Sequence, residues 1–116
     1  MKLLIVEDNP AVRRVLKTVV APLADDIREC ADGDEAVAIY RAENPDFVLM
    51  DINLGATNGI AATRRIKAFD PQARIIIVTS YDEADSREEA RQAGACGYVL
   101  KDNLLELRRL LQAAPE

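Results

Sequence analysis

The sequence predicts an α/β fold: a doubly wound sheet of five parallel strands in the order 2-1-3-4-5, with five helices. Short apolar runs alternate five times with longer amphipathic stretches along the chain. Apolar runs without polar alternation are typical of parallel strands buried on both faces. Right-handed crossovers then place helices on both sides of the sheet. The 116 residues suit one domain, so we expect a single domain over residues 1–116, with no room for an output domain after the fifth helix.

Each element has its own local signal. Asn9 and Asn58 are expected to cap the first and third helices, and Pro10 suits a first helical position. Ser80 and Glu83 have the spacing of a capping box for the fourth helix. A loop is expected over 55–59. The expected strands are 3–6, 26–30, 46–50, 74–79 and 97–100; the expected helices run from 10 to near 22, from 34 to 44, and over 58–69, 82–93 and 103–113.

Composition excludes several classes of function. The chain has 20 acidic and 15 basic residues and a net charge of −5, which disfavours direct binding to nucleic acid. It contains no histidine, so histidine-based catalysis and histidine metal sites are excluded. No apolar run approaches the ~20 residues of a membrane span, and the acidic start at Glu7 is unlike a signal peptide.

The two cysteines, Cys30 and Cys96, are expected to be small core residues. In the predicted strand order they lie on opposite edges of the sheet, which excludes a disulfide between them. Two isolated cysteines favour a reducing compartment. We therefore expect a cytoplasmic protein.

Polar residues stand at the ends of four predicted strands. Glu7 and Asp8 end the first strand, Asp51 the third, Thr79 the fourth and Lys101 the fifth. In an open parallel sheet, ligands bind beyond the carboxyl ends of the strands near the switch in strand order. The order 2-1-3-4-5 makes these four strands neighbours, so we expect their terminal side chains to converge on one crevice.

This set of groups suits phosphoryl chemistry. Crowded carboxylates repel one another unless a cation joins them, and Mg²⁺ prefers carboxylate and phosphate oxygens. A carboxylate such as Asp51 can act as a nucleophile and form an aspartyl phosphate. The Lys101 ammonium and the Thr79 hydroxyl can hold the new phosphoryl oxygens.

The arrangement resembles the receiver domain of two-component response regulators, which has a flavodoxin-like fold. The resemblance covers essentially the whole chain. The Gly-Tyr-Val-Leu-Lys-Asp run over 97–102 is similar to receivers of the LuxR/NarL-type branch. The segments that carry the resemblance are 3–9, 46–54, 58–59, 76–80 and 94–101.

The resemblance implies a role for each matching position. Asp51 would accept a phosphoryl group from a histidine kinase or a small phosphodonor, with Lys101 and Thr79 as the other catalytic groups. Mg²⁺ would be held by the side chains of Glu7, Asp8 and Asp51 and by the backbone carbonyl of Asn53.

Thr79 and Tyr98 would form a switch that reshapes the face of the fourth helix, fifth strand and fifth helix, through which a downstream protein or output domain is controlled. Such a protein catalyses its own phosphorylation and dephosphorylation but is not a turnover enzyme. The fifth helix carries five leucines, more than one core face requires, so a second copy of the chain is also a candidate partner.

Three other functions compete with this interpretation. A haloacid-dehalogenase-type phosphatase needs a carboxylic acid two residues after its nucleophile, where this chain has Asn53. A flavodoxin would need a Ser/Thr/Gly-rich phosphate loop, and the acidic start of the segment over 7–10 would repel phosphate. A phosphorylation-independent interaction module stays open, because Gly55, Thr57 and Asp102 depart from the family pattern.

Overall fold

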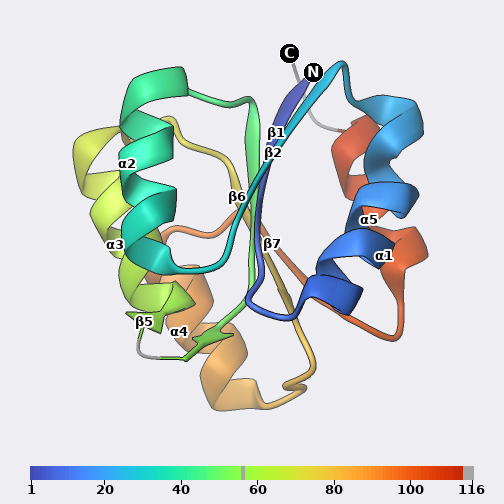
Figure 1. Cartoon of the computed structure of the whole chain (residues 1–116). Coiled ribbons are helices and arrows are strands. Elements are labelled where there is room, and N and C mark those ends of the chain that lie inside the picture. The colour runs from blue at the N-terminus through green and yellow to red at the C-terminus, as the bar shows by residue number, and fades with distance from the viewer. Residues whose placement is uncertain (56, 114–116) are drawn as a thin grey trace.

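A five-stranded parallel sheet forms the centre of the structure, a computed structural model that describes residues 1–55 and 57–113. Its order is β2-β1-β3-β6-β7, which is the predicted order 2-1-3-4-5, since β6 and β7 are the fourth and fifth strands of this sheet. The fold-class prediction is confirmed (Figure 1). The strands are β1 (Lys2–Val6), β2 (Asp26–Cys30), β3 (Phe47–Met50), β6 (Ile75–Thr79) and β7 (Gly97–Leu100).

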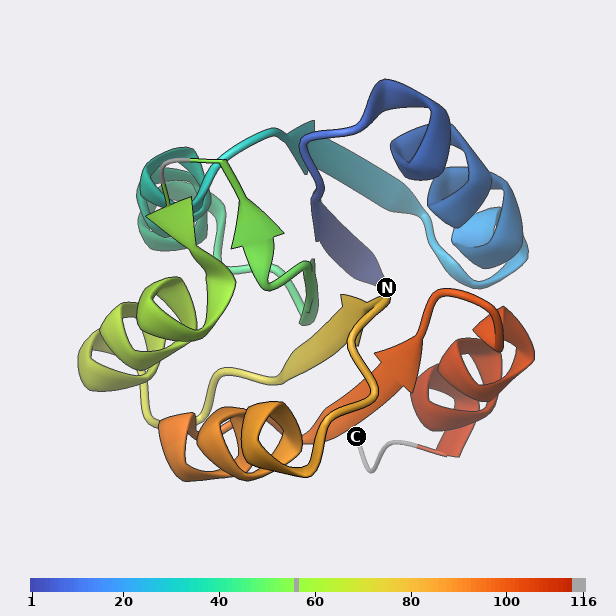
Figure 2. The same ribbon diagram turned by 90° about the horizontal axis from the view of Figure 1, so that it is seen from below.

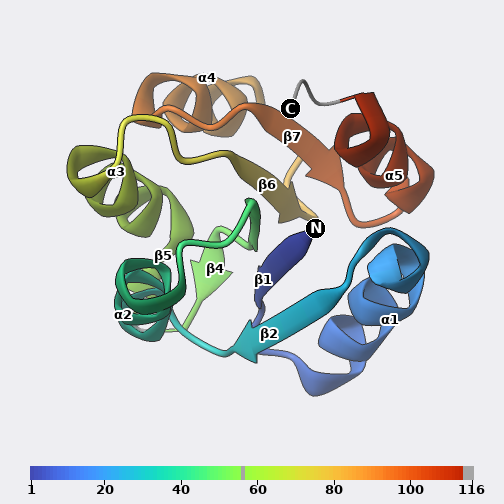
Figure 3. The same cartoon turned by 90° about the horizontal axis from the view of Figure 1, so that it is seen from above.

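Helices cover both faces of the sheet (Figures 1 and 3). One apolar cluster joins one face to α1 (Pro10–Val20) and α5 (Leu104–Ala113). The other joins the opposite face to α2 (Gly33–Glu43), α3 (Gly59–Phe69) and α4 (Ala84–Ala93). Both clusters are mainly aliphatic, and a short 3₁₀ helix, η1 (Ala21–Leu23), follows α1. No helix among the described residues is both long enough and apolar enough to cross a bilayer.

Two of the three predicted helix caps are confirmed. Asn9 Oδ1 accepts a hydrogen bond from Ala11 N at 2.9 Å, and Asn58 Oδ1 accepts one from Ile60 N at 2.7 Å. The capping box predicted at Ser80 is wrong, because α4 begins at Ala84, with Glu83 at the N-cap and no side-chain cap. The segment over 80–83 instead forms a loop beside the end of β6.

A second difference lies in the segment after β3. The loop expected over 55–59 contains part of a small antiparallel hairpin, made by β4 (Asn53–Leu54) and β5 (Thr57–Asn58). Figure 2 shows this hairpin on one side of the five-stranded sheet. Gly55 follows β4 with a φ of 69°, a left-handed conformation that glycine adopts without a steric penalty.

Of the two cysteines predicted to lie in the core, only one does. Cys30 is buried at the end of β2, as expected, and both thiols are free. The prediction that Cys96 is a core residue is wrong, because its side chain is exposed just before the edge strand β7. The leucines of α5 are also unequal: Leu107 and Leu111 are fully buried, whereas Leu105 is 70% exposed.

Candidate functional site

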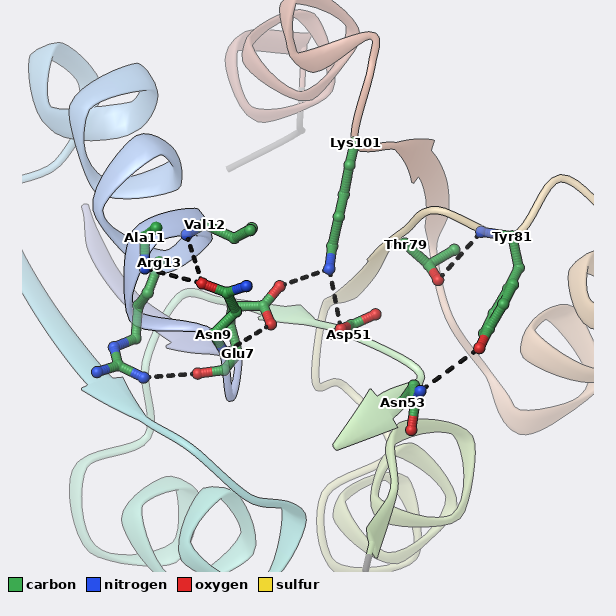
Figure 4. A network of polar contacts seen from close by, with 10 residues as sticks. All are labelled: Glu7, Asn9, Ala11, Val12, Arg13, Asp51, Asn53, Thr79, Tyr81 and Lys101. Atoms are coloured by element: carbon green, nitrogen blue, oxygen red, sulfur yellow. Dashed lines mark hydrogen bonds and ion pairs between the residues drawn. The ribbon is translucent and has the colours of Figure 1, made fainter. Parts of the chain in front are cut away.

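The strand register brings the predicted residues together at the carboxyl ends of the parallel strands. Asp51 N donates to the Val6 carbonyl at 3.1 Å, which fixes the end of β3 beside the end of β1. Lys101 N donates to the Thr79 carbonyl at 2.8 Å, which does the same for β7 and β6. The crevice predicted from strand ends therefore exists, and Figure 4 shows it with the side chains of Glu7, Asp51 and Lys101 pointing toward one another.

Lys101 lies between two nearly buried carboxylates. Its Nζ is 2.7 Å from Glu7 Oε1 and 3.0 Å from Asp51 Oδ2. Glu7 is 1% exposed and Asp51 is 5% exposed, so water screens these ion pairs poorly. The third carboxylate, Asp8, is exposed, and one oxygen from each of the three acids lies within 4.8 Å of the others.

The environment of the site shifts the pKa of two of its side chains, Glu7 and Lys101. Burial raises the pKa of the Glu7 carboxyl, and this effect outweighs the lowering by the Lys101 ammonium and by the Asn9 backbone N–H. Burial also lowers the pKa of Lys101, but the hydrogen bonds and charges of Glu7 and Asp51 together exceed it, so the net direction is upward. Lys101 thus stays a cation well above neutral pH.

The donor set fits a hard divalent cation. Glu7 Oε2 accepts a hydrogen bond from Asn9 N at 3.1 Å, and among the described residues the buried Oε1 is matched only by the Lys101 ammonium, at 2.7 Å. A buried carboxylate must be paired with a cation, and a divalent ion could pair with this oxygen as Lys101 does. Oxygen atoms from three carboxylates are ligands that Mg²⁺ prefers.

A cavity of about 210 Å³ opens beside Asp51. The Thr79 side chain is buried, and its Oγ1 accepts a hydrogen bond from Tyr81 N at 3.4 Å. Asn53 lines the same cavity, and the role of its backbone carbonyl stays a prediction. The cavity is lined by Glu7, Asp8, Asn9, Asp51, Asn53, Thr79, Ser80, Tyr81 and Lys101.

Tyr98 lies apart from this cavity but is joined to it through Tyr81. The Tyr98 hydroxyl donates to the Tyr81 carbonyl at 2.6 Å, and Arg87 lies over the Tyr98 ring at 4.6 Å from its centroid. Tyr81 also accepts a hydrogen bond on its own hydroxyl from Asn53 Nδ2 at 3.4 Å. Tyr81 therefore contacts Thr79, Asn53 and Tyr98, a role that the sequence reasoning missed although this aromatic residue stands two positions after Thr79.

Gly59 holds the main chain of Asp51 from the other side. A Cβ at position 59 would lie 1.8 Å from the Asp51 carbonyl oxygen, so only glycine fits there. Gly59 N also donates to the Ile52 carbonyl at 2.7 Å. The start of α3 is thereby packed directly against the backbone of the proposed phosphate acceptor.

Comparison with known proteins identifies the family. The sequence model of the response regulator receiver domain matches residues 3–114. This chain belongs to the response regulator receiver family. It is 37% identical over 100 residues to the chemotaxis protein CheY of Halobacterium salinarum, an alignment that covers 86% of this chain and 83% of that protein.

Solved receiver structures agree with this assignment. A LuxR-family two-component response regulator from Aurantimonas superposes with a TM-score of 0.86 at 33% identity, covering 96% of this chain and 84% of that one. The expected similarity to LuxR-type receivers is confirmed. A Burkholderia pseudomallei response regulator, solved with a phosphorylated aspartic acid, a calcium ion and citrate, gives 0.86 at 26% identity, covering 97% and 66%. Three regulatory proteins that also match are longer, and the chain covers 50%, 25% and 44% of their lengths.

Proposed function

We propose that Asp51 accepts a phosphoryl group, from a phosphohistidine of a histidine kinase or from a small phosphodonor, in a reaction that depends on Mg²⁺. The observation that carries this proposal is the Lys101 ammonium 3.0 Å from Asp51 Oδ2, at a nearly buried carboxylate that lines a cavity. The phosphorylated aspartic acid and calcium ion in the Burkholderia structure support it by analogy. The protein would be a switch and not a turnover enzyme, acting in the cytoplasm, which its free thiols favour.

The proposed chemistry is a phosphoryl transfer between two carriers. A carboxylate oxygen of Asp51 attacks the phosphorus atom and forms a new P–O bond. The bond from phosphorus to the leaving group, an imidazole nitrogen or an acetate oxygen, breaks and its electron pair stays on the leaving group. The Lys101 ammonium, already beside the accepting carboxylate, can hold one phosphoryl oxygen, and Thr79 lines the same cavity.

Glu7, Asp8 and Asp51 would hold the cation, together with the backbone carbonyl of Asn53. When bound, Mg²⁺ would neutralise charge on the carboxylates and on the incoming phosphoryl group. The protein itself holds three acidic side chains together at the carboxyl ends of β1 and β3, and it shields two of them from water.

Incubation with acetyl phosphate and Mg²⁺, followed by intact mass, tests the proposal. We expect an adduct of about 80 Da on the native chain and none on Asp51→Asn. Asp102→Asn, a change at an exposed neighbour of Lys101, is the matched control and should keep the adduct. An adduct that survives in Asp51→Asn would refute the assignment, and no adduct on the native chain would favour the phosphorylation-independent interaction module.

We further propose that phosphorylation changes the face made by α4, β7 and α5, and so controls a downstream protein or an output domain. Support comes from the contacts that run from Thr79 through Tyr81 to Tyr98. Beryllofluoride with Mg²⁺, a stable mimic of the phosphorylated state, should shift the NMR signals of Thr79, Tyr98 and α4. Unchanged signals in α4 would contradict a switch on this face. The acidic domain is not expected to bind nucleic acid directly, and self-association through α5 can be measured on both states.

A further inference from the structure

The Lys101 ammonium pairs with an oxygen of Glu7 that a divalent cation would also need. Glu7 Oε2 is already engaged by Asn9 N at 3.1 Å, which leaves Oε1 as the oxygen open to a cation. That oxygen faces Lys101 Nζ at 2.7 Å. Asp8, in contrast, is exposed and has no ion pair among the residues that the structure describes.

We infer that Lys101 and the divalent cation compete for Glu7 Oε1, so that the Glu7–Lys101 ion pair is a latch that cation binding opens. This inference rests on the proposed function, because it concerns the cation that function requires. The competition concerns Glu7 specifically. Its buried side chain would be neutralised by Lys101 in the cation-free protein and by the divalent cation in the cation-bound protein.

Burial is the physical reason for the competition. Glu7 is 1% exposed, and a buried carboxylate without a partner strongly destabilises the folded state. The chain must therefore match this charge at all times, and Lys101 does so from the end of β7. Once Glu7 is matched by another cation, Lys101 keeps its second partner, Asp51, at 3.0 Å. The latch would thus direct Lys101 toward the residue that receives the phosphoryl group.

Calorimetric titration with Mg²⁺ alone, without a phosphodonor, tests the inference. Lys101→Met removes the competitor and should tighten Mg²⁺ binding by roughly tenfold. In a Glu7→Gln background the same change should tighten binding by less than about threefold, because the contested oxygen no longer carries charge. Arg13→Met is the charge control: Arg13 donates to the Glu7 backbone carbonyl at 2.7 Å and not to its carboxylate, so its loss should change binding by less than about twofold.

Two further measurements keep the result decisive. Thermal melts establish that each variant is folded at the titration temperature. In the native chain, the Lys101 Cε methylene signal should move with the same Mg²⁺ dependence as the calorimetric binding. An equal gain from Lys101→Met in the native and Glu7→Gln backgrounds, or a stationary Lys101 signal, would overturn the latch while leaving the proposed function intact. Absence of Mg²⁺ binding in every variant would overturn the Mg²⁺ dependence and the latch together, whereas Asp51 phosphorylation is judged separately by the mass adduct.

Discussion

Replacing Gly59 with alanine should displace the main chain of Asp51 and destabilise the domain. The added Cβ would lie 1.8 Å from the Asp51 carbonyl oxygen and 3.0 Å from Met50 Cγ. An ordinary carbon–oxygen contact is about 3.3 Å, so the start of α3 and the end of β3 would have to separate by about 1.5 Å. The closest contact is with backbone and not with a flexible side-chain tip, so it cannot be relieved by a change of rotamer.

Three contributions set the change in the free energy of unfolding that we expect for Gly59→Ala. Separation would break the hydrogen bond from Gly59 N to the Ile52 carbonyl, which contributes about 1 kcal/mol. Crowding in a packed region adds about 1–3 kcal/mol, and the better helix propensity of alanine returns up to about 1 kcal/mol. We expect a net loss of about 2 kcal/mol in the free energy of unfolding, and phosphorylation of Asp51 slowed by roughly a hundredfold, as for a 1 Å misplacement of a reacting group.

Urea denaturation followed by circular dichroism measures the stability, and the initial rate of adduct formation with acetyl phosphate measures the reactivity. Gly55→Ala is the control: its Cβ would meet nothing within 4 Å, but its φ of 69° makes alanine strained by about 1 kcal/mol. That variant should lose stability and keep the native phosphorylation rate. If Gly59→Ala were no less stable than Gly55→Ala and reacted at the native rate, the close contact would not be what positions Asp51.

Three further predictions use other parts of the domain. Because the folded pKa of Lys101 lies above its ordinary 10.5, its ion pairs stabilise fully below pH 10.5 and are lost as pH rises through the folded pKa; Lys101→Met should flatten this alkaline loss, and an unchanged profile would contradict it. At pH 8 a thiol reagent should label exposed Cys96 first, since burial raises the pKa of Cys30 to about 12; equal rates would contradict this. Tyr98→Phe removes one hydrogen bond to the Tyr81 carbonyl and should cost about 1 kcal/mol or less in urea, so a loss above about 2 kcal/mol would show a larger role.

The fold and the strand-end residues were predictable because they depend on backbone rules. The carboxyl ends of parallel strands lie on one side of the sheet, so the residues directly after β1 and β3 are neighbours, and the long Lys101 side chain reaches them from the end of β7, across β6. Glu7, Asp51 and Lys101 are such residues, and the observed hydrogen bonds between adjacent strand ends confirm the placement. Asn9 and Asn58 were predictable for a similar reason, since a helix N-terminus requires an acceptor close in sequence.

The loops were not predictable, because their conformations depend on contacts between segments distant in sequence. The Ser80–Glu83 spacing suited a cap, but the loop that leaves β6 is instead tied by Tyr81 to Thr79 and Tyr98. Cys96 has the composition of a core residue, yet it stands at the edge of the sheet, where strand order alone does not say how fully a helix covers it.

Glu7 and Asp8 show where sequence reasoning reaches its limit within the site itself. The two acids are adjacent and chemically alike, and the sequence assigns them the same role. The extended chain directs consecutive side chains to opposite sides, and the structure buries Glu7 against Lys101 while leaving Asp8 exposed. Which of the two is buried depends on where β1 stops and α1 begins, a boundary that patterns locate only to within a residue or more. One residue of shift would exchange their roles, and the latch would then involve Asp8. The Asn9 cap holds this boundary in place, because its side chain accepts from the first turn of α1 while its backbone N–H donates to Glu7 Oε2, and the pairing of Lys101 with Glu7 therefore depends on that cap.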